Sequence, residues 1–222
     1  EARTLPQHFR EHGYTTVAVG KVFHHMTDTA GRSWSRPPWL PRHDPNESWR
    51  NYLLPENKAL EAAGPRRGPA FECADVPDNA YGDGKITDRA IDELRTLAAQ
   101  DAPFFLAAGF LKPHLPFNAP KRYWDLYDRN ALALADNPFR PEGAPDAAMH
   151  NWGELRNYAG IPAEGPLDDE MARSLVHGYN AATSYTDAQV GRLLTELEAL
   201  GLRDNTVIVL WGDHGWQLGE HC

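Results

Sequence analysis

Three short polar clusters in this chain each follow an apolar run, and two of them suit chemistry on an anionic group. Lys21 and His24 follow the run that ends near Gly20, and His114 follows a second run shortly after Lys112. Lysines and protonated imidazoles donate charge-assisted hydrogen bonds to sulfate or phosphate oxygens, and an imidazole can also protonate a leaving alkoxide near neutral pH. These clusters therefore predict hydrolysis of an oxyanion ester.

The third cluster is the pair Asp213 and His214, which comes directly after the apolar run 206–210. A carboxylate and an imidazole at the end of a strand can bind one divalent cation, and such a cation acts as a Lewis acid on an ester. Trp216, two residues further along, is a candidate wall for the substrate. The alternative for the pair is an ordinary turn, because polar residues are common where strands end.

Each of the other two clusters also has an ordinary interpretation when it is taken alone. A lysine after a strand is by default a solvated surface residue, and the prolines around His114 would make a rigid loop with incidental polar side chains. Three such clusters at successive strand ends are much harder to assign to chance. If the strands are parallel, their carboxyl ends lie on one edge of the sheet, where ligands bind in α/β folds.

The elements that must position these clusters alternate between helix and strand. Apolar spacing predicts helices over 4–12, 86–99 and 168–200 (the last as one long helix or two abutting ones) and strands over 14–19, 104–110 and 206–210. Thr4 is a candidate N-cap of the first helix, Thr87 or Asp83 is a candidate for the second, and a brief helix is expected over 121–127. This alternation indicates an α/β fold with a sheet layered between helices.

Two stretches rich in proline, 26–84 and 129–165, are longer than ordinary connections in compact domains. They are predicted to be irregular excursions from the body of the fold. Aromatic residues in the first stretch could stack on a carbohydrate, but such residues more often pack a loop against the protein. These residues are Trp34, Trp39, Trp49 and Tyr52.

The composition is that of a globular chain with a sizeable core. Hydrophobic residues make up 41% of the 222 residues, and 22 basic against 31 acidic residues give a net charge of -9, which argues against nucleic-acid and polybasic membrane surfaces. No stretch approaches the roughly 18–20 apolar residues of a membrane span. Cys73 and Cys222 are too few for a disulfide framework, and Cys73 is interpreted as a small buried residue or an unpaired thiol.

The clusters together resemble those of type I sulfatases, and they are most similar to the iduronate-2-sulfatase branch. The stretches that carry the resemblance are Gly20-Lys21-Val22-Phe23-His24, Lys112-Pro113-His114-Leu115-Pro116-Phe117 and Asp213-His214-Gly215-Trp216, with 184–194 similar to the helix before the metal-bearing strand. They occur in the family's order and cover nearly the whole chain. The resemblance implies an alkaline-phosphatase-like fold, with 1–222 as the central part of a single sulfatase catalytic domain that is incomplete at both ends.

The resemblance also implies roles for individual residues. Lys21 would contact the sulfate and the nucleophile, His24 would steady the hydrated aldehyde of a formylglycine, and His114 would bind sulfate and protonate the leaving oxygen. Asp213 and His214 would ligate Ca²⁺, with Mg²⁺ as the less favoured ion. Because calcium takes about six to eight oxygen ligands, the chain alone is expected to bind it poorly.

One part of the family's pattern is missing from the sequence. Formylglycine is made from the first residue of a Cys/Ser-x-Pro/Ala-x-Arg motif, and neither Cys73 nor Cys222 lies in such a motif. The nucleophile is therefore expected upstream, and the segment alone is expected to be inactive. The resemblance implies that the substrate is a sulfated carbohydrate, such as a glycosaminoglycan unit, or another small sulfate ester. Lys21, His114 and Trp216 would contact it, in a periplasmic, secreted or lysosome-like compartment.

Two other functions stay open at this point. A phosphodiesterase or phosphonate hydrolase of the same superfamily would use similar lysine, histidine and metal clusters, and the residue at the nucleophile position would distinguish it from a sulfatase. A pseudoenzyme would keep the fold and hold a sulfated glycan in the same crevice without turning it over. Fold-level resemblance alone does not separate these functions.

Overall fold

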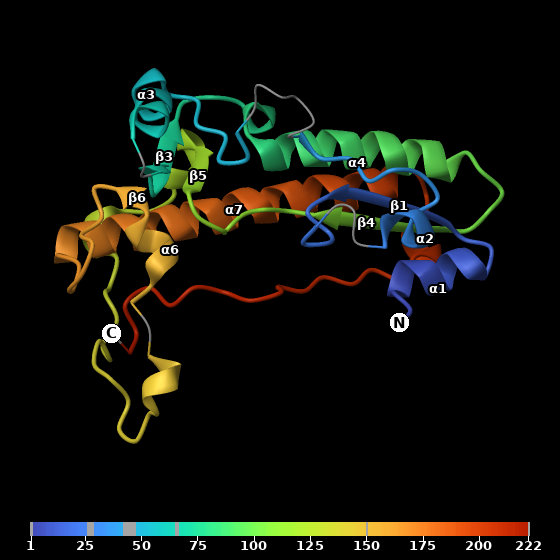
Figure 1. Cartoon of the computed structure of the whole chain (residues 1–222). Coiled ribbons are helices and arrows are strands. Elements are labelled where there is room, and N and C mark those ends of the chain that lie inside the picture. Colours follow the sequence, from blue (N-terminus) through green and yellow to red (C-terminus); the bar gives the residue numbers. More distant parts are fainter. Residues whose placement is uncertain (1, 26–28, 42–47, 65–66, 150, 222) are drawn as a thin grey trace. The chain divides into compact units, whose positions relative to one another are not determined.

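The structure is a computed structural model that describes residues 2–25, 29–41, 48–64, 67–149 and 151–221, and Figure 1 shows its elements. The chain forms two compact units. Unit 1 comprises Glu1–Trp49, Asp78–Leu111 and Thr186–Leu210, and unit 2 comprises Arg50–Pro77, Lys112–Tyr185 and Trp211–Cys222. Among the described residues, every sheet is a parallel pair of strands: β1 with β4 in unit 1, and β2 with β6 and β3 with β5 in unit 2. The predicted α/β class is confirmed.

The sheet of unit 1 joins the two strands that precede the first two polar clusters. β1 (Thr15–Gly20) runs parallel to β4 (Phe104–Gly109), with Gly20 opposite Gly109 at their shared end. The predicted strands over 14–19 and 104–110 are therefore confirmed to within one residue at each end. Because the pair is parallel and in register, both strands end at the same edge of the sheet.

Helix α1 (Leu5–Glu11) forms where the sequence predicts it. The Thr4 hydroxyl accepts a hydrogen bond from the Gln7 amide at 3.2 Å, which satisfies one of the free N–H groups of the first turn. Gly13 has a φ of 86° just past the end of the helix, a conformation that glycine adopts without the Cβ penalty of other residues. Phe9 then packs its ring on Phe105 of β4, with the ring centroids 5.0 Å apart.

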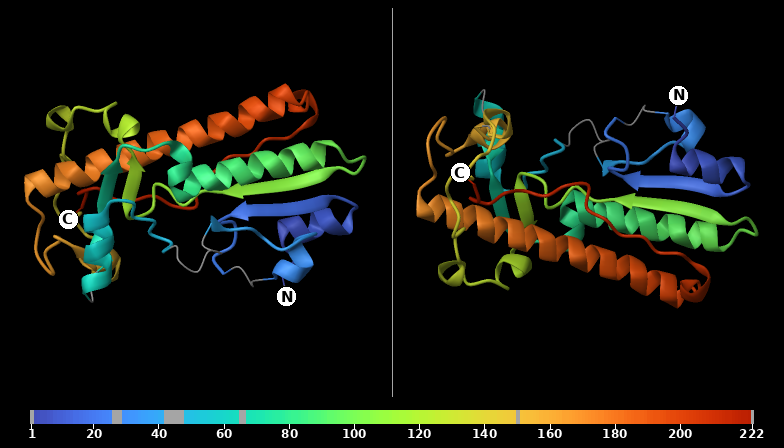
Figure 2. Two further views of the ribbon diagram at one scale, coloured as in Figure 1. Left: turned by 90° about the horizontal axis from the view of Figure 1, so that it is seen from above. Right: turned by 90° about the horizontal axis from the view of Figure 1, so that it is seen from below.

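Helix α4 (Gly82–Ala98) packs against the same two strands and runs beside them in both views of Figure 2. Its apolar face, including Ile86 and Ala90, contacts Val17 and Val19 in the core of unit 1. The helix begins four residues earlier than predicted, and its N-cap residue Tyr81 makes no side-chain cap hydrogen bond.

Neither predicted cap of α4 caps it, because both side chains are used inside the fold. Thr87 lies within the helix and donates its hydroxyl hydrogen to the Asp83 carbonyl at 2.9 Å. The Asp83 carboxylate accepts a hydrogen bond from the Leu111 amide at 3.0 Å, just beyond β4. Asp83 therefore fixes the path of the chain as it leaves the strand.

Unit 2 is built from short elements around one apolar core. Its strands are β2 (Arg67–Pro69), β3 (Phe71–Ala74), β5 (Phe117–Pro120) and β6 (Tyr158–Ala159), and its short helices are α3 (Pro55–Ala63), α5 (Lys121–Trp124) and α6 (Gly153–Arg156). The core consists of Ala70, Leu115, Phe117, Tyr158, Ile161, Leu175 and Ala182. The loop after β4 is thus anchored in this core through Leu115 and Phe117.

Helix α7 (Asp169–Ala199) is one helix, which decides between the two alternatives for 168–200. Residues up to Tyr185 belong to unit 2, and those from Thr186 belong to unit 1. Gly178 allows a close approach in unit 2, since a Cβ at this position would lie 3.0 Å from the Phe117 Cβ. Among the described residues, no helix is both long and apolar enough to cross a membrane.

The predicted strand over 206–210 is wrong. The structure assigns no strand to these residues and pairs them with none of the described strands, and Val207 and Leu210 are 91% and 74% exposed. The backbone at Thr206 is extended, with φ -129° and ψ 126°. The apolar run therefore favours the extended conformation, but a strand also needs a neighbouring ladder of hydrogen bonds.

The two excursions contain more regular structure than predicted. The first contains α2 (Ala30–Ser33), α3, β2 and β3, and the second contains α6 and β6. Their strands pair with partners far along the chain, which local sequence patterns do not reveal. In contrast, the helix expected over 121–127 is short and ends at Trp124.

The aromatic residues of the first excursion support packing rather than an open carbohydrate surface. Trp34 and Tyr52 are only 3% and 2% exposed, and the Tyr52 hydroxyl donates to the Pro69 carbonyl. The expectation for Cys73 is only partly correct, because it is unpaired but exposed. Strand alternation explains the exposure: Glu72 of β3 faces inward, and the next residue faces the other way. Cys222 lies outside the described residues.

Candidate active site

Lys21 and His24 lie directly after β1, at the edge where both strands of unit 1 end. The Lys21 amide donates to the Gly109 carbonyl at 2.8 Å, which continues the ladder one residue past the strand. Lys21 is half-buried and His24 is exposed, with its ring 4.6 Å from that of His25. Two cationic or titratable side chains therefore follow the carboxyl end of a parallel strand, as the sequence predicts.

Two glycines make this strand edge possible. Gly20 has a φ of 82°, and a Cβ there would lie 2.1 Å from the Gly109 carbonyl oxygen. A Cβ on Gly109 would lie 2.1 Å from the Lys21 carbonyl oxygen. Neither contact could be relieved by a flexible side chain, because both involve backbone atoms. The two backbones can approach this closely beside Lys21 because both positions are glycine.

The loop after β4 is braced by its own lysine. Lys112 donates from Nζ to the carbonyl oxygens of His114, at 3.2 Å, and Pro116. Leu115 and Phe117 are buried in the core of unit 2, and the peptide bonds before both prolines of the loop are cis. The ammonium of Lys112 therefore serves the shape of this loop, and the loop presents His114.

The imidazole of His114 is oriented from several sides within unit 2. Its Nδ1 donates to the Leu115 carbonyl at 2.7 Å, because a carbonyl oxygen can only accept. Its Nε2 faces the Glu154 carboxylate at 3.8 Å, and its ring meets the Trp216 indole edge-on with centroids 5.8 Å apart. The hydrogen bond at Nδ1 fixes one proton there and directs Nε2 toward whatever the histidine acts on.

Glu154 and Arg67 are the residues beside His114 that the sequence did not suggest. Arg67 donates from Nη1 to Glu154 Oε1 at 3.0 Å, so one carboxylate oxygen serves both the guanidinium and the imidazole. Glu154 lies on α6 inside the second excursion, and no motif marked it. The only available signal is its charge, which many solvated glutamates share.

Asp213 and His214 are adjacent and largely solvent-exposed. Their side chains are 69% and 61% exposed, and Asp213 Oδ2 lies 3.8 Å from His214 Nε2. The Asp213 carboxylate also accepts from the His214 amide at 3.0 Å, which is a turn-type contact. Within the described residues, no three His, Cys, Asp or Glu side chains are grouped to hold a metal. The pair by itself does not fit a calcium site, since calcium needs more oxygen ligands.

Trp216 packs beside His114 rather than standing alone in solvent. It is half-buried against the core of unit 2, with its ring 6.4 Å from that of Phe117 in an edge-to-face arrangement. Its indole Nε1 is buried and has no hydrogen-bond partner among the described residues. Of the predicted site residues, unit 2 thus brings together His114 and Trp216. Lys21 and His24 belong to unit 1.

This α/β architecture is shared by solved phosphonate monoester hydrolases. The solved phosphonate monoester hydrolase from Silicibacter pomeroyi superposes with a TM-score of 0.63, at 22% sequence identity over 96% of this chain and 47% of that one. The corresponding enzyme of Agrobacterium radiobacter gives a TM-score of 0.62, covering 100% of this chain and 49% of that one. At this level of identity the likeness shows the fold.

The chain belongs to the sulfatase family, whose family model matches residues 1–222. Human iduronate 2-sulfatase is 38% identical over 229 residues, which covers 98% of this chain and 41% of that protein. A sulfatase of Formosa agariphila is 26% identical, over 97% of this chain and 42% of its own length. The chain therefore spans about two fifths of the length of these relatives.

Proposed function

We propose that the full-length protein is a sulfuric ester hydrolase that acts on a sulfated sugar. The observation that carries the proposal is the set of contacts around His114, a histidine held by the Leu115 carbonyl, the Glu154 carboxylate and the Trp216 ring. Membership of the sulfatase family and the 38% identity to human iduronate 2-sulfatase support this choice of reaction and substrate.

The proposed division of labour follows from the chemistry of each side chain. Lys21 contributes a positive charge to the sulfate oxygens, which carry negative charge throughout the reaction. His114 donates a proton from Nε2 to the leaving sugar oxygen, and the hydrogen bond at Nδ1 keeps the ring in the orientation that this transfer needs. His24 and Trp216 are proposed to contact the nucleophile and the sugar, respectively.

The proposal also includes a divalent cation and a formylglycine nucleophile. Asp213 and His214 are proposed as two ligands of a divalent cation, Ca²⁺ in preference to Mg²⁺, whose remaining ligands come from elsewhere in the full-length protein. Formylglycine would supply the nucleophilic oxygen, and neither cysteine of this sequence lies in the motif from which it is made. The proposed roles of His114 and Lys21 do not depend on where the cation or the formylglycine lies.

The experiment compares two esters with the full-length protein. Sulfate release from a disaccharide that ends in iduronate 2-sulfate is measured beside hydrolysis of an aryl phosphonate monoester. The proposal predicts that the sulfate ester has the larger kcat/KM, and that His114→Ala lowers it by about 10²–10⁴-fold, the range expected for loss of a general acid.

The second candidate function is phosphonate monoester hydrolysis, favoured by the two solved structures that share the fold. A larger kcat/KM for the phosphonate would establish that function instead. Binding of the sulfated disaccharide without release of sulfate would identify a non-catalytic glycan-binding protein. Either result would overturn the proposed sulfatase activity.

A further inference from the structure

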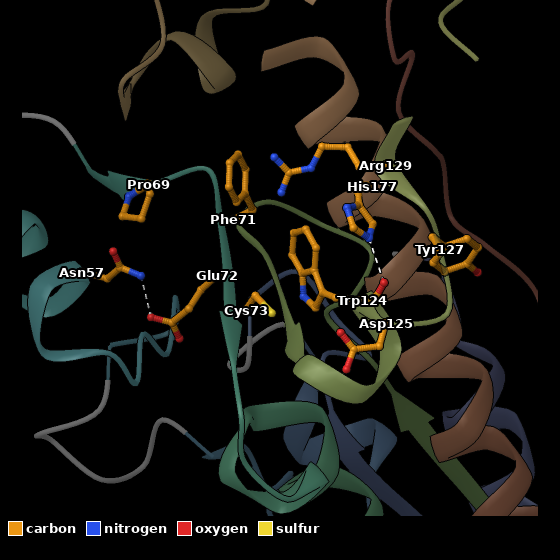
Figure 3. Close-up of a pocket in the computed structure, with 10 residues that line it drawn as sticks. All are labelled: Asn57, Pro69, Phe71, Glu72, Cys73, Trp124, Asp125, Tyr127, Arg129 and His177. Carbon is orange, nitrogen blue, oxygen red and sulfur yellow. Dashed lines mark hydrogen bonds between the residues drawn. The ribbon is translucent and has the colours of Figure 1, made fainter. Parts of the chain in front are cut away.

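Unit 2 contains a cavity of about 590 Å³ that none of the predicted site residues lines (Figure 3). It lies at β3, α5 and the first half of α7. Its lining includes Phe71, Cys73, Trp124, Asp125, Arg129 and His177. The volume falls in the range of about 300–1,000 Å³ that is usual for small-molecule sites.

Trp124 and Phe71 form the apolar part of the cavity. Trp124 is 4% exposed, and its indole nitrogen donates to the Ala119 carbonyl at 3.2 Å, so it forms a fixed floor. Phe71 is half-buried and lines the cavity beside it, with the two ring centroids 5.9 Å apart. A compact ligand with one apolar face would therefore meet a preformed wall.

One acidic residue of the lining is already used by the fold. The Glu72 carboxylate accepts hydrogen bonds from the Leu53 amide at 2.8 Å and from Asn57 Nδ2 at 2.8 Å. In Figure 3, Glu72 and Asn57 lie on one side of β3, and Cys73 and Trp124 lie on the other. Because the Glu72 carboxylate is already hydrogen-bonded, we expect a ligand to bind on the side of β3 that carries Cys73 and Trp124.

His177 presents a nitrogen for which the described residues provide no partner. The side chain is 8% exposed, and its Nε2 donates to the Trp124 carbonyl at 2.8 Å, because the carbonyl can only accept. Nδ1 is buried without a hydrogen bond among the described residues. In Figure 3 it lies on the side of the ring away from that carbonyl. A buried nitrogen without a partner is unfavourable, and a ligand hydroxyl that donates to it would remove this cost.

The charged groups of the cavity favour an anion at one position. Asp125 is paired with the Lys121 ammonium at 2.6 Å. Arg129 is exposed, and its guanidinium makes no ion pair or hydrogen bond with the residues that the structure describes. A planar guanidinium binds a carboxylate or sulfate through two parallel hydrogen bonds.

We propose that this cavity binds an acidic sugar residue of a glycan. Arg129 pairs with the carboxylate or sulfate of the sugar, a ring hydroxyl donates to His177 Nδ1, and a C–H face of the ring packs on Phe71. The choice of a saccharide over another hydroxylated acid rests on the proposed function. The contacts to an anion and to a hydroxyl do not rest on the proposed function, because they follow from the side chains of Arg129 and His177.

The exposed thiol of Cys73 reports occupancy of the cavity. Burial raises the pKa of the Cys73 thiol, and the charge of Lys121 acts in the opposite direction. Because the thiolate is the form that reacts, alkylation of this exposed thiol by iodoacetamide is followed at mildly alkaline pH. Trypsin releases this thiol in the peptide 68–85, which mass spectrometry resolves from other cysteines. Methyl β-D-glucuronoside at tenfold above its Kd should slow the reaction about tenfold, in proportion to the empty fraction.

Matched probes and variants of the full-length protein decide the outcome. Methyl β-D-glucoside, which lacks the carboxylate, and inorganic sulfate, which lacks the ring, should bind at least about tenfold more weakly, so at the same concentration each should slow alkylation of Cys73 by about twofold or less. Arg129→Ala should weaken protection by a similar factor, and Arg140→Ala, at an exposed arginine outside the cavity, should leave it unchanged.

The proposal is overturned by any of three results: no protection by the glucuronoside, equal protection by the glucoside or by sulfate alone, or full protection in Arg129→Ala. Protection of Cys73 is measured without sulfate release. If the sulfatase assay shows no activity, the protection of Cys73 can still be interpreted. If Cys73 is not protected, the sulfatase assay can still be interpreted.

Discussion

At the scale of single residues, the environment of His114 is the most informative feature of the chain. An imidazole whose Nδ1 is tied to its own loop has one nitrogen left for chemistry, and here that nitrogen faces a carboxylate shared with Arg67. Arg67 holds Glu154 in position, so Glu154 can in turn hold the ring. We therefore regard Glu154 as a positioning residue rather than a catalytic one.

Glu154→Gln tests this role in the full-length protein. The amide keeps the shape of the side chain but loses the charge beside His114, so kcat should fall about tenfold, equivalent to about 1.4 kcal/mol, while KM changes little. Glu164→Gln, at an exposed glutamate of the same unit, is the matched control. An unchanged kcat, or an equal loss in Glu164→Gln, would contradict a positioning role for Glu154.

At the scale of elements, two glycines of unit 1 have requirements that can be separated: Gly20, at the strand edge before Lys21, and Gly13, just past the end of α1. Gly13 and Gly20 have nearly the same positive φ, 86° and 82°. A Cβ at Gly13 would meet nothing within 4 Å, whereas a Cβ at Gly20 would meet the Gly109 carbonyl at 2.1 Å. Backbone strain is common to both positions, and the steric clash belongs to Gly20 alone.

Alanine at each position should therefore have different effects on the free energy of unfolding. Gly13→Ala should cost about 1–2 kcal/mol for the left-handed conformation alone. Gly20→Ala should cost about 3 kcal/mol or more, because β1 and β4 must also move apart. Urea unfolding measures both values. Equal losses in the two variants would show that the close approach at Gly109 contributes nothing.

The buried phenol of Tyr158, on β6, predicts a loss of stability at alkaline pH. Burial raises the pKa of Tyr158 from 10.0 to about 12, while the nearby Arg67 acts in the opposite direction. Between these values the unfolded chain loses the phenol proton and the folded chain keeps it. The stabilisation is therefore complete below pH 10 and is lost as the pH rises through about 12.

Tyr158→Phe removes this titration. The slope of unfolding free energy against pH in that window should become less steep by the equivalent of one proton, which is about 1.4 kcal/mol per pH unit at most. Tyr14→Phe, at a half-buried tyrosine of unit 1, provides the comparison. Identical slopes in the wild type and Tyr158→Phe would contradict the assignment.

The sequence predicted the elements whose signals are local. Thr4 and Gly13 mark the ends of α1, and apolar spacing marks α7, because capping and periodicity act within a few turns. The strands β2 and β6 went unpredicted, since each is short and is defined by a partner far along the chain. The run 206–210 shows the opposite case, with a strand-like pattern but no partner among the described residues.

The same limit applies to the site. Lys21, His24 and His114 could be selected from residue type and from their position after apolar runs. Glu154 could not, because its importance lies in a contact across 40 positions of sequence that joins it to His114. Residue types that perform chemistry are visible in a sequence, whereas the side chains that orient them become visible only when the chain is folded.

At the scale of the whole molecule, the proposed sulfatase activity assigns Lys21 and His114 to one reaction. Lys21 belongs to unit 1 and His114 to unit 2. The strands β1 and β4, which precede the two clusters in the sequence, end in register at Gly20 and Gly109. Functional coupling between the clusters can be measured without any further geometry.

A double-mutant cycle on the full-length protein tests this claim most directly. Sulfate release from a disaccharide ending in iduronate 2-sulfate is measured for Lys21→Ala, His114→Ala and the double variant. Residues that act on one transition state give strongly non-additive losses, so the double variant should lose little more kcat/KM than the worse single variant. Losses that multiply within experimental error would show that the two residues act independently, and would contradict the proposed roles of Lys21 and His114 in one reaction.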